Sequence, residues 1–186
     1  MAPKSLKKKH TIDRRDLRDN KARKSYLQVG ALCYRPSKKG TRILLVTSRE
    51  TRRWIIPKGW PMKRRTPAGA AAREAYEEAG VQGVISQKSV GFFTYRKDMG
   101  RGNRIHCTVR VFPMQVTEIL KKFPESRERK VKWFSPKKAA KRVREPELKA
   151  LIRHVAKQLD EKPDVGIQAF RLEVESDVVP ESSVVG

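Results

Sequence analysis

The sequence predicts one α/β domain in which helices pack on the faces of a mixed β-sheet. Runs with strand character are interspersed with helical patterns, but without the strict βαβ order that a purely parallel sheet requires. The length of 186 residues fits a single domain. The apolar fraction is 38%, which is sufficient for one hydrophobic core. Together these observations favour a single core with short extensions at either end.

The strands are predicted from apolar runs that are bounded by turn residues. A turn-like segment, residues 36–40, separates the first two, and a polar loop containing Gly100 and Gly102 joins the fourth and fifth into a hairpin. The predicted strands span Ser25–Tyr34, Arg42–Thr47, Trp54–Ile56, Val90–Tyr95, Arg104–Val116 and Val131–Phe134.

Three helices are predicted, and the first has clear signals at both ends. It spans Thr66–Ala79, with Thr66 as the N-cap, Pro67 at the first helical position and Gly80 after its end. The other two span residues 136–143 and 147–159. The last helix places five apolar side chains on one face, namely Leu148, Leu151, Ile152, Val155 and Leu159.

The charge distribution divides the chain into three parts. Lys and Arg number 44 against 20 Asp and Glu, a net charge of +24. We expect a basic flexible arm at 1–24, a basic folded domain at 25–159 and an acidic, loosely ordered tail at 160–186. The arm is either plainly solvated or a clamp that orders on a polyanion. Because so much like charge repels itself, a polyanionic partner or substrate is expected.

Several classes of protein are excluded by composition. No apolar run approaches the ~18 residues of a membrane span. No apolar segment follows the basic N-terminus, which argues against a secretory signal. Two cysteines, Cys33 and Cys107, lie in strand-like runs and form no disulfide framework. A cytoplasmic protein with reduced, structural cysteines and no membrane contact is therefore expected.

The first helix carries the chemistry. Glu74, Glu77 and Glu78 stand at i, i+3 and i+4, so their side chains share an arc of roughly 100°. Arg73 lies four residues before Glu77 and can hold that carboxylate. Three carboxylates on one arc attract a hard divalent cation such as Mg²⁺.

The surroundings of these carboxylates favour a metal site over a solvated acidic face. The other side of the helix carries Ala72, Ala75 and Ala79, which allow it to lie close to the sheet. This is also the only acidic cluster in a basic body. Negative charge within positive charge suits a site at which a metal binds carboxylates and cations bind phosphates.

The segment from Gly59 to Val81 resembles the Nudix box, G-x5-E-x7-R-E-U-x-E-E-x-G-U, where U is a bulky apolar residue. Two positions depart from the pattern: Arg65 stands where the family usually has its first glutamate, and Ala75 is small where an apolar residue is expected. The matching residues are Gly59, Arg73, Glu74, Glu77, Glu78, Gly80 and Val81.

The resemblance extends beyond this box. Residues 44–57 and 131–140 are similar to the flanking segments of diphosphoinositol polyphosphate phosphohydrolases and related dinucleoside polyphosphate hydrolases, so that roughly residues 27–157 are covered. The resemblance implies a Nudix-type α/β/α sandwich with a mixed β-sheet. It also implies a metal-activated water that attacks a phosphoanhydride bond.

The resemblance implies a role for each box residue. Glu74 and Glu78 are expected to bind Mg²⁺, with Mn²⁺ as the alternative ion. Glu77 is a further ligand or holds a metal-bound water, and the carbonyl of Gly59 joins the metal site. Arg73 orients a helix carboxylate. An additional base is expected from a later loop, with Glu125 and Glu128 as the candidates.

Basic and polar residues outside the helix are predicted to bind the phosphates of the substrate, because Arg grips phosphate in a bidentate way. For each one alone, a plain surface charge is the alternative. The predicted substrate-binding residues are Ser48, Arg49, Arg53, Lys58, Arg104, His106 and Arg129.

Three functions are compatible with this sequence. The first is a metal-dependent hydrolase that cleaves a pyrophosphate bond in a diphosphoinositol polyphosphate or a dinucleoside polyphosphate. The second is an RNA 5′-pyrophosphohydrolase whose basic arm holds the chain. The third is a non-enzymatic, basic nucleic-acid-binding module on a Nudix scaffold. Aromatic residues make up only 7% and form no evident stacking platform, which favours the first function.

Overall fold

The computed structural model describes residues 25–100 and 103–161. The predicted basic arm, residues 1–24, lies outside these residues. So do residues 162–186 of the predicted acidic tail and residues 101–102 of the hairpin loop. The division into arm, domain and tail therefore stays a prediction.

In the part of the chain that the structure describes, one mixed sheet of eight strands forms the centre. Its main path runs β3-β2-β1-β7-β5, while β4 pairs with β1, β6 with β7 and β8 with β2. The β1–β7 pair is parallel, and the other pairs are antiparallel. The strands are β1 Ser25–Arg35, β2 Arg42–Thr47, β3 Trp54–Ile55, β4 Lys58–Gly59, β5 Val81–Ile85, β6 Gly91–Asp98, β7 Arg104–Ile119 and β8 Val131–Phe134.

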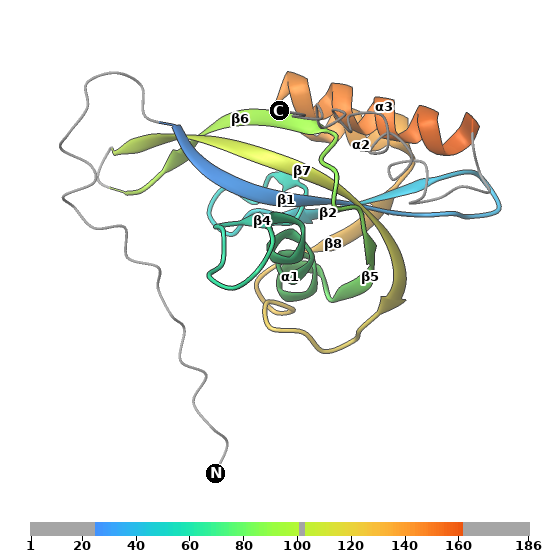
Figure 1. The fold of residues 1–186 in the computed structure, drawn as a ribbon, viewed down its shortest axis with the longest axis horizontal. Coiled ribbons are helices and arrows are strands. Elements are labelled where there is room, and N and C mark those ends of the chain that lie inside the picture. Colours follow the sequence, from blue (N-terminus) through green and yellow to red (C-terminus); the bar gives the residue numbers. More distant parts are fainter. Residues whose placement is uncertain (1–24, 101–102, 162–186) are drawn as a thin grey trace, which may run out of the picture.

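Among residues 25–100 and 103–161, three helices cover this sheet. They are α1 Pro67–Ala79, α2 Pro136–Arg142 and α3 Pro146–Glu161. Figure 1 shows α1 on one side of the strands, with α2 and α3 on the other. The predicted α/β/α sandwich with a mixed sheet is thereby confirmed.

Helix α1 begins and ends where its capping residues predicted. The Thr66 hydroxyl accepts a hydrogen bond from the Gly69 amide at 3.0 Å, and Gly80 closes the helix in the left-handed conformation at φ 65°. Of the three alanines expected to face the sheet, Ala75 and Ala79 are buried and Ala72 is partly buried. Buried alanines keep the helix close to the sheet, which holds its carboxylates in place.

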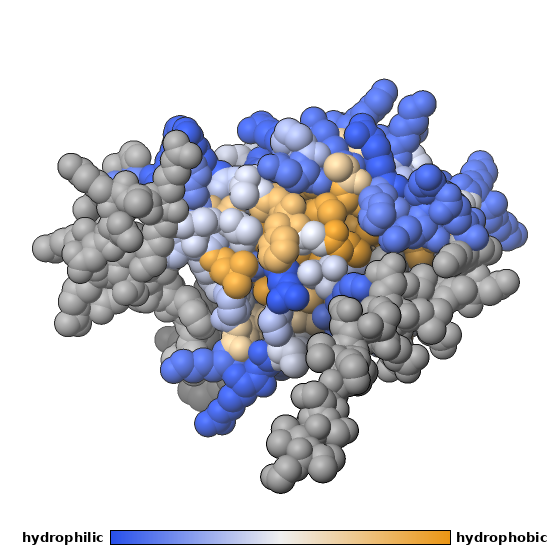
Figure 2. All heavy atoms as spheres, turned by 45° about the horizontal axis from the view of Figure 1, so that its top comes forward, coloured by the Kyte–Doolittle hydropathy of each residue, from blue (hydrophilic) through white to orange (hydrophobic). Residues whose placement is uncertain are grey.

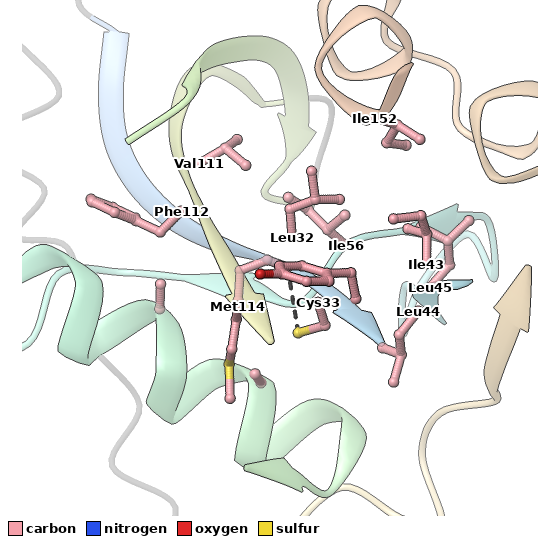
Figure 3. Close-up of a cluster of buried hydrophobic side chains, with 14 of the residues drawn as sticks. Leu32, Cys33, Ile43, Leu44, Leu45, Ile56, Val111, Phe112, Met114 and Ile152 are labelled. Carbon is pink, nitrogen blue, oxygen red and sulfur yellow. Dashed lines mark hydrogen bonds between the residues drawn. The ribbon is translucent and has the colours of Figure 1, made fainter. Parts of the chain in front are cut away.

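The core lies between the sheet and the helices on both sides. Figure 3 shows apolar side chains of β1, β2 and β7 packing toward one another, with Ile152 of α3 above them. Four of the five apolar residues predicted for the α3 face are buried, and Leu151 is partly buried. Cys33 and Cys107 are both buried free thiols, as expected.

Two strands were not predicted from the sequence. β5 contains Gly83 and three exposed positions, so it lacks an apolar alternation that could identify it. β4 has only two residues, and Lys58-Gly59 is expected to be a turn when it is considered alone. Pairing of Val29 with Gly59 converts this turn into a strand beside β1, next to the carboxylates of α1.

Charged side chains are spread widely over the surface. Figure 2 shows hydrophilic side chains around an apolar centre on the face turned toward the reader. Net charge alone therefore does not locate a site on this face. Among the described residues, no helix is both long and apolar enough to cross a membrane.

Candidate active site

Helix α1 brings two of its carboxylates against the short strand β4. The Glu74 carboxylate lies where a Cβ atom on residue 59 would be, so only glycine permits this approach. One oxygen of Glu78 accepts a hydrogen bond from the Lys58 backbone amide at 3.2 Å. Glu74 and Glu78 are therefore held at one edge of β4, as the helical spacing predicted.

A buried arginine joins these carboxylates from a distant part of the chain. Arg129, in the segment before β8, donates through Nη2 to Glu78 and through Nε to Glu125 at 2.6 Å. Its Nη1 donates to the Thr47 carbonyl at 2.9 Å. The side chains of Arg129 and Glu78 are each only 7% exposed. Arg129 is thus an internal cation among carboxylates and does not lie on an open rim.

Glu77 faces a different partner. Its carboxylate accepts a hydrogen bond from Arg73 Nε at 2.6 Å, which is the i, i+4 contact that the sequence predicted. The Arg73 guanidinium also lies 4.9 Å from the centre of the Tyr76 ring. Arg73 thus holds Glu77, whereas Arg129 holds Glu78. Among residues 25–100 and 103–161, no group of three or more acidic, histidine or cysteine side chains is arranged so that it could bind a metal ion.

Burial, and secondarily repulsion from neighbouring carboxylates, raises the pKa values of the two carboxyl groups at β4. The pKa of Glu74 is raised to about 8, by burial and then by the charges of Glu78, Glu77 and Glu125. Burial raises the pKa of Glu78 to about 7, even though Arg129 and Lys58 act in the opposite direction. The nearby cations therefore do not fully compensate this cluster.

These residues fit a hard divalent cation. Buried Glu78 and partly buried Glu74 supply oxygen donors, and Gly59 leaves room for the Glu74 carboxylate beside β4. The raised pKa values of both groups show that more positive charge would stabilise the ionised forms. Arg65, at the position of the missing first glutamate of the box, has an exposed side chain. The roles predicted for Glu74, Glu77, Glu78 and Gly59 stay predictions.

A cationic and aromatic surface lies beside the carboxylates. The Lys58 ammonium lies 4.8 Å and the Arg53 guanidinium 5.5 Å from the centre of the Tyr95 ring. The Tyr95 hydroxyl donates to Gln28 at 2.7 Å. Arg53 is held by a 2.5 Å ion pair with buried Glu145. Burial lowers the pKa of Lys58, partly against the effect of the Glu78 charge.

Tyr95, Gln28 and Glu145 were not identified from the sequence. They come from β6, β1 and the residue before α3, so no local motif connects them. The only available signal was the alternation along residues 91–98, which places Tyr95 on the same side of β6 as buried Phe93.

Of the other residues predicted to bind phosphate, Arg49 lies near the carboxylates, whereas Ser48 has a structural role. Arg49 lies near the site, 3.6 Å from both Glu125 and Glu128. The Ser48 hydroxyl is bonded to Thr51 at 2.8 Å and accepts from the Arg53 amide at 3.2 Å, so it stabilises a turn.

Arg104 and His106 are not brought to the carboxylates. Both side chains are exposed. Cys107 pairs in register with Tyr95, which lies beside the site, and strand alternation places Arg104 and His106 on the opposite face of β7 from Cys107. Arg104 lies 3.9 Å from Asp98 at the end of the hairpin. We therefore leave these two residues out of the proposed site.

The two candidate bases, Glu125 and Glu128, lie at different distances from the carboxylate cluster. The Glu125 amide donates to the Glu77 carbonyl at 3.0 Å, which folds this loop onto the end of α1, and its carboxylate shares Arg129 with Glu78. Glu128 lies further out, beside Arg49, and its carbonyl accepts from Arg52 at 2.5 Å. Of the two, Glu125 is the one placed among the carboxylates.

A separate groove of about 750 Å³ lies between α2 and α3. Its lining includes Lys137, Lys141, Arg153 and Lys157, together with Asp160 and Glu161. None of the residues of the carboxylate cluster contributes to it. The candidate chemistry therefore lies at α1 and β4 and not in this groove.

A mixed sheet between helices, with a carboxylate-bearing helix packed against a glycine of the sheet, defines a class of α/β/α sandwich domains. Within that class the chain belongs to the Nudix family, because the model of the NUDIX domain matches residues 26–155.

Two proteins that are similar in sequence are both named diphosphoinositol polyphosphate phosphohydrolases. Mouse diphosphoinositol polyphosphate phosphohydrolase 3-alpha is 37% identical over 116 residues, which cover 61% of this chain and 66% of that protein. Rat diphosphoinositol polyphosphate phosphohydrolase 2 is 36% identical over 116 residues, which cover 61% of this chain and 60% of that protein. The chain thus spans somewhat less than two thirds of the length of these relatives.

Solved structures agree on the fold. C. elegans Ap4A hydrolase has a TM-score of 0.56 at 19% identity, over 73% of this chain and 99% of that one. E. coli dihydroneopterin triphosphate pyrophosphohydrolase has a TM-score of 0.55 at 17% identity, over 72% and 98%. The fold expected from the resemblance is confirmed.

The close approach at Gly59 predicts that G59A weakens metal binding while the fold survives. The added Cβ would displace the Glu74 carboxylate, which is the flexible end of a side chain and can move aside. We expect Mg²⁺ affinity to fall about 10-fold or more, measured by calorimetry. The control is G59A in an E74A background, where the same change should have little further effect. Equal losses in both backgrounds would contradict the assignment.

The raised pKa values predict that the metal-free protein loses stability as pH rises. Glu74 and Glu78 keep protons in the folded state up to about pH 8 and 7, whereas the unfolded groups release theirs near the ordinary value of 4.5. Their stabilising contribution is thus complete below about pH 4.5 and is lost as pH rises through 7–8.

We expect the free energy of unfolding in EDTA to fall by on the order of 2 kcal/mol from pH 6 to pH 8. Urea denaturation of the wild type and of E74Q measures this difference. The variant should have the shallower pH dependence, because Gln cannot ionise. Identical slopes would show that Glu74 has an ordinary pKa.

Proposed function

We propose that this protein is a metal-dependent hydrolase that cleaves a phosphoanhydride bond in a highly phosphorylated small molecule. The substrates that we propose are a diphosphoinositol polyphosphate or a dinucleoside polyphosphate, as in the names of similar proteins. The observation that carries this proposal is the pair of carboxylates, buried Glu78 and partly buried Glu74, packed at Gly59 beside cationic side chains. Such a pair suits a site where a metal and phosphates meet.

The metal site would be formed by α1 and β4. Glu74, Glu78 and the Gly59 carbonyl would hold Mg²⁺, with Mn²⁺ as the alternative ion. When bound, the metal supplies Lewis acidity and neutralises phosphate charge. Arg73 positions Glu77 through their 2.6 Å hydrogen bond. Glu77 would therefore stay next to the metal site and would not be one of its direct ligands.

Glu125 is the residue that we propose as the base outside the helix. It is partly exposed, near Glu74 and Glu78, and fixed by Arg129 and by the bond of its amide to the Glu77 carbonyl. A carboxylate held in this way can accept a proton from a water molecule that enters the site. Glu128 is held away at Arg49 and at its own carbonyl contact, so it is the weaker candidate.

The basic side chains next to the carboxylates would bind the substrate phosphates. Lys58 and Arg53 lie against the Tyr95 ring, and the Lys58 charge acts on Glu78. Low exposure strengthens their interaction with an anion that displaces water. Arg129 is bonded to Glu78, so its positive charge would stabilise that carboxylate and would not be used to bind a substrate phosphate.

A panel of substrates tests this function. The purified protein is incubated with a diphosphoinositol polyphosphate, diadenosine tetraphosphate and 5′-triphosphorylated RNA, in Mg²⁺ and in EDTA. We expect Mg²⁺-dependent cleavage of at least one small molecule, absent in EDTA. Cleavage of RNA alone would replace our proposal with the RNA hydrolase. Absence of cleavage, with RNA binding retained, would favour the non-enzymatic module. A cytoplasmic location and nucleic-acid contacts of the arm stay predictions.

A further inference from the structure

The groove between α2 and α3 lies on the side of the sheet away from α1 (Figure 1). Both helices contribute cations to its lining, and the side chains of all four are exposed. These cations are Lys137 and Lys141 of α2 and Arg153 and Lys157 of α3. A volume of about 750 Å³ bordered by cations of two helices is therefore open to an anionic ligand, apart from the carboxylate cluster.

Most of these charges have no partner within the part of the chain that the structure describes. Lys157 lies 3.6 Å from Glu161, whereas the other three cations of the groove take part in no salt bridge or hydrogen bond there. Residues 132–157 carry nine basic and two acidic side chains, and one of these two acids is already the buried partner of Arg53. Like charges at such density repel each other, and an anionic ligand would relieve this repulsion.

Cations of a distant segment extend the surface beyond the groove. The Thr41 hydroxyl donates a hydrogen bond to Asp160 at 3.2 Å, which brings the turn between β1 and β2 to the end of α3. This turn carries two exposed lysines, Lys38 and Lys39. We call the groove cations and these two lysines the α2–α3 cationic face. Its extent suits a ligand with repeated negative charges better than a small phosphorylated molecule.

The composition of this face favours a duplex among such ligands. None of the described residues that line the groove is aromatic, so the bases of a single strand would have no ring on which to stack. A duplex keeps its bases inside and presents one negative charge per about 1.7 Å of its axis. A lipid surface fits less well, because the apolar side of α3 is buried in the core and cannot insert into a bilayer.

We propose that the α2–α3 cationic face binds double-stranded nucleic acid through its backbone phosphates, separately from the catalytic site. Phosphates of one strand lie in the groove beside Lys141 and Arg153, and their counterions are released on contact. DNA and RNA duplexes share this phosphate chemistry. The duplex is a ligand of this face and not a substrate of the carboxylate cluster, which lies on the α1 side of the sheet.

The binding test reverses two charges of the groove in the full-length protein. A fluorescent duplex of about 20 base pairs, made as DNA and as RNA, is titrated in EDTA at several salt concentrations, and its anisotropy gives Kd. We expect K141E/R153E to raise Kd about 10-fold or more. The salt dependence should lose a slope of about two, one for each lost phosphate contact.

A second double variant controls for net charge. K121E/K122E changes the charge by the same amount at two exposed lysines, in the loop that follows β7 and is bonded to Gly80 at the end of α1. It leaves the α2–α3 cationic face intact, so its Kd should stay within about 3-fold of the wild type. Circular dichroism of both variants checks that they are folded.

Hydrogen exchange of the unsubstituted protein gives a readout that needs no variant. Addition of the duplex should slow amide exchange in residues 135–144 and 153–161 and leave α1 unchanged. Because both measurements are made in EDTA, they do not depend on hydrolysis, and the proposed function can fail without affecting this result.

Several results would overturn the proposal. Equal weakening by the two double variants would place the binding elsewhere on this basic chain. Tighter binding of a single strand than of a duplex of the same length would exclude recognition of the duplex, and protection confined to α1 would move the ligand to the catalytic site. Binding of phosphatidylserine vesicles that K141E/R153E abolishes, without binding of either duplex, would replace nucleic acid by a lipid surface.

Discussion

Turnover should fall by about 100- to 1,000-fold when Glu78 is replaced by Gln, which is the range for removing one charged or charge-stabilising group from an active site. Gln has nearly the same shape, and its side-chain oxygen can still accept the hydrogen bond from the Lys58 amide. The negative charge is lost, together with one of the two acceptor oxygens that bind Lys58 and Arg129, and with the charge goes the attraction for a divalent cation. E74Q should have an effect of similar size for the same reason.

The fold should survive both substitutions. The pKa of Glu78 is about 7, so that the wild-type protein already tolerates a neutral side chain at this position near neutral pH. Steady-state rates at saturating Mg²⁺, together with circular dichroism, separate loss of activity from loss of structure. E118Q is the control, because Glu118 is exposed on β7. Wild-type activity in both E74Q and E78Q would refute the metal site.

The largest loss of stability is expected for Arg129→Met. Methionine keeps most of the buried volume but removes a guanidinium that is bonded to Glu78, Glu125 and the Thr47 carbonyl. Removing one partner of a buried ion pair leaves the other charge uncompensated, which destabilises by about 3–5 kcal/mol. We expect a loss of about 3 kcal/mol at pH 8, measured by urea denaturation.

This loss should depend on pH and on metal. Below the pKa of Glu78 the carboxyl is neutral and needs no cation, so R129M should be less destabilising at pH 6 than at pH 8. Added Mg²⁺ should restore more stability to R129M than to the wild type, because it supplies the missing positive charge. R127M removes the same charge from an exposed neighbour and should change little. Equal losses in R127M and R129M would contradict an internal role for Arg129.

Local sequence signals predicted α1 and its carboxylates. Thr66, Pro67 and Gly80 act within a few residues of themselves, so the bounds of the helix could be predicted without the fold. The ion pair of Arg73 and Glu77 is a contact within one helix and was equally predictable. The family followed from the same segment, because its spacing is specific.

The roles of the basic residues could not be predicted in this way. Arg104 and Arg129 both precede or begin strands and have the same chemistry, yet Arg104 lies exposed at a hairpin end and Arg129 is buried beside Glu78. Which of them meets a carboxylate depends on how segments some fifty residues apart come together. No local pattern contains that information.

The sequence by itself determined the family, the α/β class and the carboxylate helix, because each rests on spacing along a continuous segment. The tertiary structure decided which cations and aromatics surround those carboxylates. Tyr26 meets Trp60 only because β4 pairs with β1, and Glu78 meets Arg129 only because the loop before β8 folds onto α1. Such contacts are set by the packing of distant elements, which a motif within one segment cannot specify.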